Sequence, residues 1–136
     1  MQLQQGQDNI FVDTLRILSG AVLGVYGSGR KNIKTPMATA GIRGTGTYLE
    51  VDDKQTYLCT CYGEVEFTAN NDPAVTETLS TSHHEAPRYI RQNSTGVYMV
   101  NAKPINHTDA ELIMLEATVG REPPFVGEGY DPNADY

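Results

Sequence analysis

Two cysteines, Cys59 and Cys61, are the whole thiol content of the chain, and a single residue separates them. Side chains two positions apart in a β-strand point to the same face, so both thiols are predicted to project together with Tyr57. The opposite face of this strand is predicted to carry Leu58, Thr60 and Tyr62. Thiols in this arrangement can supply half of a tetrahedral metal site, form a strained disulfide across a Cα separation of about 6.6 Å, or pack inertly in a core.

Histidines would be the partners in such a metal site, and the chain has three of them, His83, His84 and His107. Thiolate and neutral imidazole together suit Zn²⁺ or copper. A haem-type centre is a further option, although the C-x-x-C-H motif of covalent haem attachment is absent. The spacing matches no standard zinc module, an extended backbone would let only one of His83 and His84 face the cysteines, and His107 could equally cap a helix. The candidate metal ligands are Cys59, Cys61, His83, His84 and His107.

A cysteine and a histidine can also act as nucleophile and general base. The one pair of this kind is Cys59 or Cys61 with His83 or His84. No residue pattern supplies an acid that would orient the histidine, or an oxyanion hole. We therefore predict no catalytic residues and a protein that is not an enzyme.

The composition is that of an acidic chain of one domain. The chain has 136 residues and a net charge of −7, so a phosphate backbone is an unfavourable partner and nucleic-acid binding is not predicted. No stretch approaches the roughly 20 apolar residues that a membrane-spanning helix needs. The first residues, MQLQQGQDNIF, lack the basic and apolar regions of a signal peptide. Residues 1–125 are predicted to form the domain and residues 126–136 an acidic tail.

A mainly β fold is favoured by abundant threonine, valine and tyrosine, with 13 glycines and 7 prolines to supply turns. The clearest hairpin joins residues 47–51 and 56–62 through a polar turn at 52–54. Residues 70–87 show no strong period and are predicted to form a long excursion. Other strands are predicted at 10–18 and 21–26, which should pair as a hairpin, and at 33–43, 64–69 and twice within 88–100.

One helix is predicted at residues 109–119. Thr108 and Glu111 have the spacing of a capping box at its start, and Gly120 fits the left-handed position past its end. The apolar face of this helix is predicted to carry Leu112, Leu115 and Val119.

The glycine-rich stretch GIRGTG (41–46) is not a phosphate loop, because its glycines lead into a strand and no Gly-Lys-Ser or Gly-Lys-Thr ends it. The three glycines Gly41, Gly44 and Gly46 are predicted to permit a tight or bulged β-corner, with Arg43 paired to an acidic group.

The segment TPMATAGIRGTGTYLEV (35–51) resembles the signature of the FecR-domain family of bacterial periplasmic proteins. The structural motif that carries the resemblance includes Gly41, Arg43, Gly44 and Thr45. The motifs CTCYG, HHEAPRYI (83–90) and INHTDAELIMLEATVGREPPF (105–125) resemble a subgroup of small FecR-like proteins.

The resemblance implies an antiparallel β-sandwich or roll of short hairpins with one C-terminal helix, in a periplasmic or cell-surface protein. It implies a non-catalytic domain that binds a protein partner or assembles with itself, and the strand at 10–18 could be exchanged between copies. The alternatives are a metal-binding or redox module as the primary function, and a periplasmic iron-uptake signalling domain. The membrane anchor and anti-sigma segment of the full regulators have no counterpart in this sequence.

Overall fold

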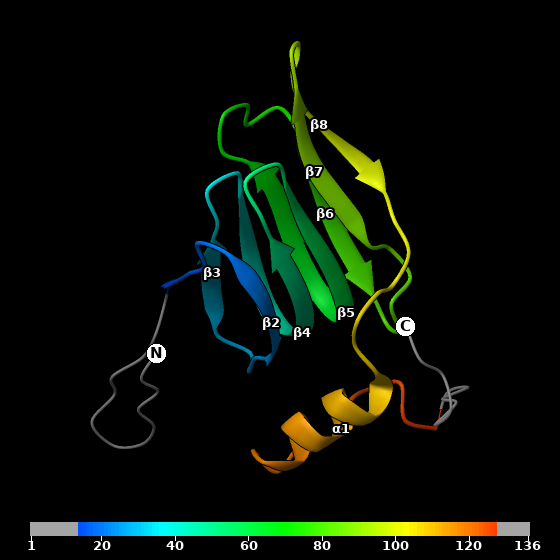
Figure 1. The fold of residues 1–136 in the computed structure, drawn as a ribbon. Helices are drawn as coiled ribbons and strands as arrows, with labels where there is room; N and C mark the ends of the chain where they lie inside the picture. The colour runs from blue at the N-terminus through cyan, green and yellow to red at the C-terminus, as the bar shows by residue number, and fades with distance from the viewer. Residues whose placement is uncertain (1–13, 128–136) are drawn as a thin grey trace.

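The computed structural model describes residues 14–127, and over this range the chain is mainly β with one C-terminal helix, as predicted (Figure 1). The last part of the predicted acidic tail, residues 128–136, lies outside the described range, as do residues 10–13 of the first predicted strand. The elements are β1 (Thr14–Arg16), β2 (Gly20–Val25), β3 (Arg30–Lys34), β4 (Ala38–Val51), β5 (Gln55–Ala69), β6 (Thr76–Thr81), β7 (Arg88–Asn93), β8 (Gly96–Asn101) and α1 (Asp109–Ala117).

The centre of the sheet is the predicted hairpin, now formed by the whole of β4 and β5. Its turn is closed by Asp52, whose backbone N–H donates to the Gln55 carbonyl over 3.1 Å and whose carboxylate accepts from the Lys54 N–H at 2.7 Å. The strands are 14 and 15 residues long, well beyond the short hairpin strands that the sequence suggested. Each of them can therefore pair with two different neighbours along its length.

The other strands attach to the two edges of this hairpin. β3 pairs with the first half of β4 and β2 with its second half, while β7 pairs with the first half of β5 and β6 with its second half. β8 extends the sheet beyond β7, and β1 runs parallel to β3. The result is one curved, mixed sheet of eight described strands (Figure 1).

The predicted hairpin between the strands at 10–18 and 21–26 is wrong, because β1 pairs with β3 and β2 pairs with β4. The link between them passes through Gly20 in a left-handed conformation (φ +96°). It carries the chain from one neighbour of the long hairpin to another. Pairing with β4 is favoured because it fills an edge that β3 leaves open from Gly46 to Val51.

The predicted excursion at 70–87 is also wrong in part, since it contains β6. This strand pairs with β5 from Thr68↔Thr76 to Gly63↔Thr81. Its sequence, TETLST, buries only Leu79, so it has no apolar alternation for sequence reasoning to find. Its partner supplies the strand conformation through backbone pairing.

Irregular pairing interrupts the middle of the long hairpin. The register shifts between Arg43 and Gly46, and again between Gly46↔Tyr62 and Thr47↔Thr60, which leaves Cys61 without a partner on β4. Such bulges bend a strand and change the face on which the following side chains lie. Tyr62 consequently packs in the same cluster as the cysteines, and its predicted position on the opposite face is wrong.

The predicted bulged corner in GIRGTG is confirmed by this register shift and by the left-handed Gly44 (φ +55°). Gly46 is needed because a β-carbon there would lie 2.6 Å from the ring of Tyr62. Arg43 is exposed and stands opposite Glu64 in the register. Within residues 14–127 it makes no ion pair, so its predicted partner is a cross-strand neighbour and not a salt bridge.

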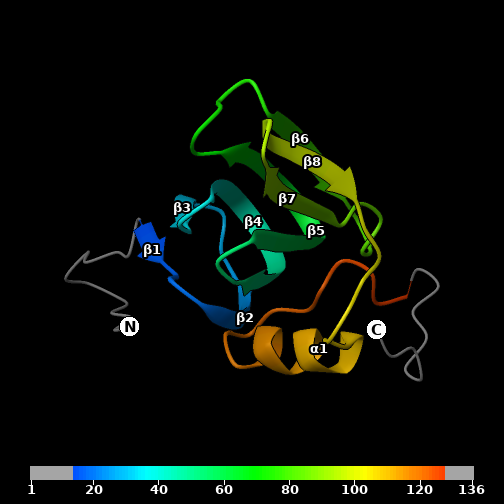
Figure 2. The ribbon, with the colours of Figure 1, turned by 45° about the horizontal axis from the view of Figure 1, so that its top comes forward.

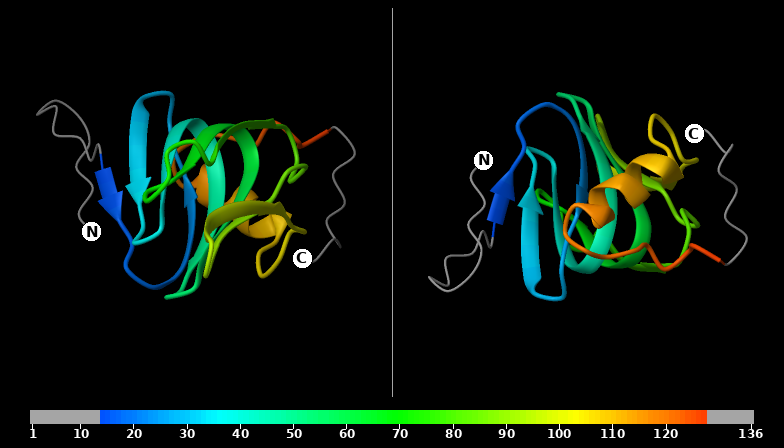
Figure 3. Two further views of the ribbon diagram at one scale, coloured as in Figure 1. Left: turned by 90° about the horizontal axis from the view of Figure 1, so that it is seen from above. Right: turned by 90° about the horizontal axis from the view of Figure 1, so that it is seen from below.

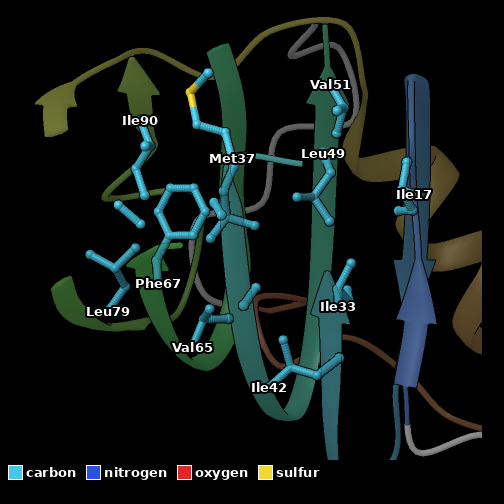
Figure 4. Packing of buried hydrophobic residues seen from close by; sticks show 14 residues of the cluster. Ile17, Ile33, Met37, Ile42, Leu49, Val51, Val65, Phe67, Leu79 and Ile90 are labelled. Atoms are coloured by element: carbon cyan, nitrogen blue, oxygen red, sulfur yellow. The ribbon is translucent and has the colours of Figure 1, made fainter. Parts of the chain in front are cut away.

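The bends place apolar clusters on both faces of the curved sheet. The larger cluster fills the space that the sheet encloses (Figure 4), and its largest buried members include Ile33, Leu58 and Phe67. A second cluster lies on the other face of β5 and includes residues of α1 and of the segment that follows it. Figure 2 shows α1 and this segment beside the sheet. Seen from below, α1 lies across one end of the sheet (Figure 3). The second cluster consists of Tyr48, Tyr57, Cys59, Cys61, Tyr62, Leu112 and Phe125.

The helix begins as predicted, with both hydrogen bonds of the capping box between Thr108 and Glu111 present. It ends two residues before the predicted boundary, and Gly120 takes the predicted left-handed conformation (φ +74°). Val119 is 43 % exposed and lies outside the buried face, which includes Leu112 and Glu116. No helix within residues 14–127 combines the length and apolar character that crossing a membrane requires.

Candidate metal centre

Both cysteines and two of the three histidines meet in the second cluster. Cys59 and Cys61 lie in β5, His84 lies in the loop after β6, and His107 lies two residues before α1 begins. All four side chains are buried, with exposures of 0 % for both cysteines, 5 % for His84 and 1 % for His107. Their ligand atoms lie within 4.8 Å of one another. The four residues are therefore placed to bind a metal ion.

Four spacings between these atoms are close to, or slightly shorter than, the edges of a coordination tetrahedron. With zinc–sulfur bonds of about 2.3 Å and zinc–nitrogen bonds of about 2.0–2.1 Å, tetrahedral edges are about 3.8 Å between sulfurs, 3.6 Å between sulfur and nitrogen, and 3.3 Å between nitrogens. The Sγ atoms of Cys59 and Cys61 are 3.8 Å apart. Cys59 Sγ is 3.2 Å from His84 Nδ1, and Cys61 Sγ is 3.4 Å from His107 Nε2. The two histidine nitrogens are 3.1 Å apart.

Hydrogen bonds behind the histidines fix which nitrogen faces the sulfurs. A carboxylate or a carbonyl oxygen only accepts, so His84 Nε2–H donates to Asp109 Oδ1 over 2.7 Å and His107 Nδ1–H donates to the Ile105 carbonyl over 2.6 Å. His84 Nδ1 and His107 Nε2 then carry the lone pairs, and both atoms face the cysteines. This outer shell of acceptors is the usual support for metal-binding imidazoles.

The loop after β6 turns His84 toward the cysteines. Its backbone is left-handed (φ +56°), and its N–H donates to the Cys61 carbonyl over 2.9 Å. The carboxylate of Glu85 closes the loop by accepting from the backbone N–H groups of Ser82 and His83. Because of the left-handed turn, the adjacent rings of His83 and His84 reach different partners.

His107 is held against the sheet just before the helix begins. Its ring stacks on Tyr48 with centroids 4.7 Å apart, and the preceding residue, Asn106, is left-handed (φ +60°). Capping is carried out by the next residue, Thr108, so His107 itself does not cap the helix.

The electrostatics of the cluster favour thiolate at one of the two sulfurs. Hydrogen bonding with the Cys61 thiol is the largest effect that lowers the pKa of Cys59, to about 4, and the neighbouring imidazoles of His107 and His84 add to the lowering while burial opposes it. Burial and the neighbouring Cys59 charge raise the pKa of Cys61 well above its usual range. Burial lowers the pKa of His84, but the hydrogen bonds and charges of Cys59 and Asp109 outweigh it and raise the pKa.

The remaining predicted ligand, His83, does not join the group of four. Its Nε2 lies 2.6 Å from Asp109 Oδ2, and its ring stacks on Phe125 with centroids 4.5 Å apart. Asp109 thus contacts both adjacent histidines and is only 1 % exposed. Sequence reasoning missed Asp109 because the position was explained by the helix start. The available signal was an acidic residue two positions after His107, where a carboxylate can accept a hydrogen bond from a metal-binding imidazole.

The chain is thus a mainly β domain with a buried cluster of two cysteines and two histidines that is compatible with a metal site. No family model matches the chain, and no curated protein matches it. Among solved structures it is similar to a candidate anti-sigma factor from Parabacteroides distasonis ATCC 8503, with a TM-score of 0.52 and 12 % identity. The match covers 81 % of this chain and 58 % of that protein, so the chain spans little more than half of its length. At 12 % identity, this similarity concerns the fold alone.

Proposed function

We propose that this chain is a non-catalytic domain in which a zinc ion, bound by Cys59, Cys61, His84 and His107, fastens α1 and the loop after β6 to β5. The observation that carries the proposal is the agreement of four ligand–ligand distances with tetrahedral edges. Closed four-ligand centres of this kind are structural, since no position remains for water or substrate. The metal would add a cross-link to the apolar packing and hydrogen bonds that already join these segments.

Zinc fits this set of ligands better than the other cofactors considered. Tetrahedral sites with two sulfur and two nitrogen ligands are typical of zinc, whereas copper centres favour square-planar geometry or a trigonal site with one cysteine. A haem takes only axial ligands from the protein, but here four side-chain donors converge on one point. Both cysteines are free, with their sulfurs 3.8 Å apart, so the disulfide is not formed.

A catalytic role for the thiolate has no support from the surroundings of the cysteines. Cys59 and Cys61 are fully buried, so a substrate has no path to either sulfur. Two surface cavities, of about 110 and 230 Å³, are lined by other residues. Burial of both sulfurs therefore argues against nucleophilic attack, whereas a thiolate at Cys59 is compatible with metal binding.

Metal analysis tests the zinc proposal directly. Protein purified without chelators is expected to contain about one zinc per chain, and its cobalt-substituted form should show the intense visible absorption of tetrahedral Co²⁺ together with thiolate charge-transfer bands. Both cysteines should react with a thiol reagent only after chelation or unfolding. Metal at background level, with both thiols titratable in the native protein, would contradict the proposal.

We further propose that the domain is regulatory and acts through protein contacts, either with a partner or with a second copy, in an exported FecR-type protein. Support comes from the fold likeness to a candidate anti-sigma factor and from the sequence resemblance around Arg43 and Gly44. An iron-uptake signalling role is the narrower form of the same proposal. In an oxidising compartment, burial and metal ligation would both protect the thiols from oxidation.

Light scattering and partner capture test this second part. The zinc-loaded domain is expected either to self-associate with increasing concentration or to retain a specific protein from an envelope extract. Chelated protein, whose helix is no longer fastened, serves as the comparison. A domain that stays monomeric at every concentration and retains nothing would count against an interaction role.

A further inference from the structure

A second set of possible metal ligands lies beside the four buried ones. His83, His84 and Asp109 also place ligand atoms within 4.8 Å of one another. The closest pair is His83 Nε2 and Asp109 Oδ2, at 2.6 Å. The four-residue centre makes no use of His83, and nothing in the zinc proposal requires a histidine at that position.

The second set differs from the first in its exposure. The side chain of His83 is 23 % exposed, whereas those of His84 and Asp109 are 2 % and 1 % exposed. Both cysteines are fully buried, and His107 is 1 % exposed. Of the ligands and the side chains that hydrogen-bond to them around Asp109, His83 is thus the one that solvent reaches. An ion in solution meets this imidazole before it meets a sulfur.

The imidazole of His84 connects the two sets. Its Nε2 lies 2.7 Å from Asp109 Oδ1, and its Nδ1 lies 3.2 Å from Cys59 Sγ. A single aromatic ring, that of His84, therefore lies between the His83–Asp109 pair and the Cys59 sulfur. An ion held by His83 and Asp109 needs to move only past that ring to reach the tetrahedral position.

We propose that His83 and Asp109 form an outer loading site, which binds a divalent transition-metal cation from solution and passes it to the four buried ligands. The inference rests on the proposed zinc function and adds a route to it. Binding at the outer site uses a nitrogen and a carboxylate oxygen, a pair that accepts zinc and related ions. The hydrogen that His83 Nε2 shares with Asp109 must first leave to water or reappear on Nδ1. Asp109 can accept from His84 Nε2 through Oδ1 throughout, because the outer site uses Oδ2.

Two contacts hold the His83 ring in this position, and neither of them requires His83 to bind an ion permanently. The ring is stacked on Phe125 at 26° between planes, and the Glu85 carboxylate accepts from its backbone N–H at 2.8 Å. Both contacts persist whether or not an ion is present, because neither uses the Nε2 atom. A pre-positioned imidazole of this kind lowers the ordering cost of capturing an ion.

Stopped-flow loading of the chelated protein with Co²⁺ tests the proposal, with the cobalt–thiolate absorption as the signal. His83→Gln, which keeps a donor near Asp109 but removes the imidazole, should slow loading about tenfold, the lower end of the effects on affinity or activity that follow changes beside metal ligands. Removal of Co²⁺ by excess chelator should slow by the same factor, because the ion leaves by the route through which it came. The equilibrium Kd is then unchanged. His83→Phe, which keeps an aromatic ring on Phe125, should behave alike.

Ser82→Ala is the matched control, since it removes only the hydroxyl hydrogen bond to Glu85 in the same loop and leaves the backbone N–H groups of Ser82 and His83 donating to that carboxylate. Its loading rate should stay near that of the wild type. Unchanged rates in both His83 variants would overturn the proposal. A weaker Kd with faster release would assign His83 to support of Asp109 alone, and a second Co²⁺ retained per chain would make the outer site a resident one; either result also overturns it. Wild-type protein that binds no Co²⁺ would instead contradict the zinc function itself.

Discussion

Cys59→Ser is expected to abolish tight zinc binding and to remove the whole metal-dependent part of the stability. Cys59 supplies one of the four proposed ligands, and a serine hydroxyl cannot replace it because it stays protonated and its oxygen does not reach as far as the sulfur. A ligand that binds only the folded state stabilises it by about 4.1 kcal/mol when its concentration is a thousand times the Kd. Denaturant unfolding of the zinc-loaded wild type and of the variant should differ by this order of magnitude.

The same comparison carries its own control. Chelated wild type and Cys59→Ser should unfold at nearly the same denaturant concentration, because both lack the metal. Thr68→Ser lies in the same strand, on a half-buried position away from the centre, and it should keep both the zinc and the stabilisation. A Cys59→Ser protein as stable as the zinc-loaded wild type would show that the metal does not fasten the fold.

Gly63→Ala is expected to destabilise the domain by roughly 2–5 kcal/mol, the sum of a left-handed backbone penalty and of overpacking. Gly63 has φ +93°, and a β-carbon there would lie 2.4 Å from the Gly44 carbonyl oxygen and 2.9 Å from the Thr45 Cα. These are backbone atoms, which cannot swing away as a side-chain end would. The shift required would pass into the adjoining irregular pairing at Cys61, so zinc affinity should fall with stability.

Gly20→Ala separates the two causes of this effect. Gly20 has nearly the same backbone angle, φ +96°, but a β-carbon there meets nothing within 4 Å. Its loss of stability should be limited to about 1–2 kcal/mol, the cost of the left-handed conformation alone. Thermal or denaturant unfolding of both variants provides the measurement. Equal losses at the two positions would mean that the close approach of the two strands at Gly63 is not a constraint.

Local patterns in the sequence were sufficient where a structure is made by neighbouring residues. The turn at Asp52, the capping box at Thr108 and the left-handed Gly120 were all predicted and confirmed, since each depends on hydrogen bonds or backbone angles within a few positions. The same holds for the common direction of the Cys59 and Cys61 side chains, which follows from the two-residue period of a strand.

Features that depend on distant partners were missed. Tyr62 changed face because a bulge, created by pairing with Gly46, interrupts the alternation that the sequence suggests. β6 exists through its pairing with β5 and not through any apolar pattern of its own. Asp109 became part of the centre because the loop at His84 folds onto the start of the helix. None of these is encoded within a short window of residues.

The ligands of the centre are also far apart along the chain, and this has a consequence for how the molecule is made. His84 lies 25 residues after Cys59, and His107 lies 46 residues after Cys61. A nascent or partly folded chain offers only the two sulfurs, and closing each loop costs conformational entropy before another ligand is gained. In the proposed zinc-bound form, full coordination would be reached only when the sheet, the loop and the helix have met, so bound zinc would report that folding is complete.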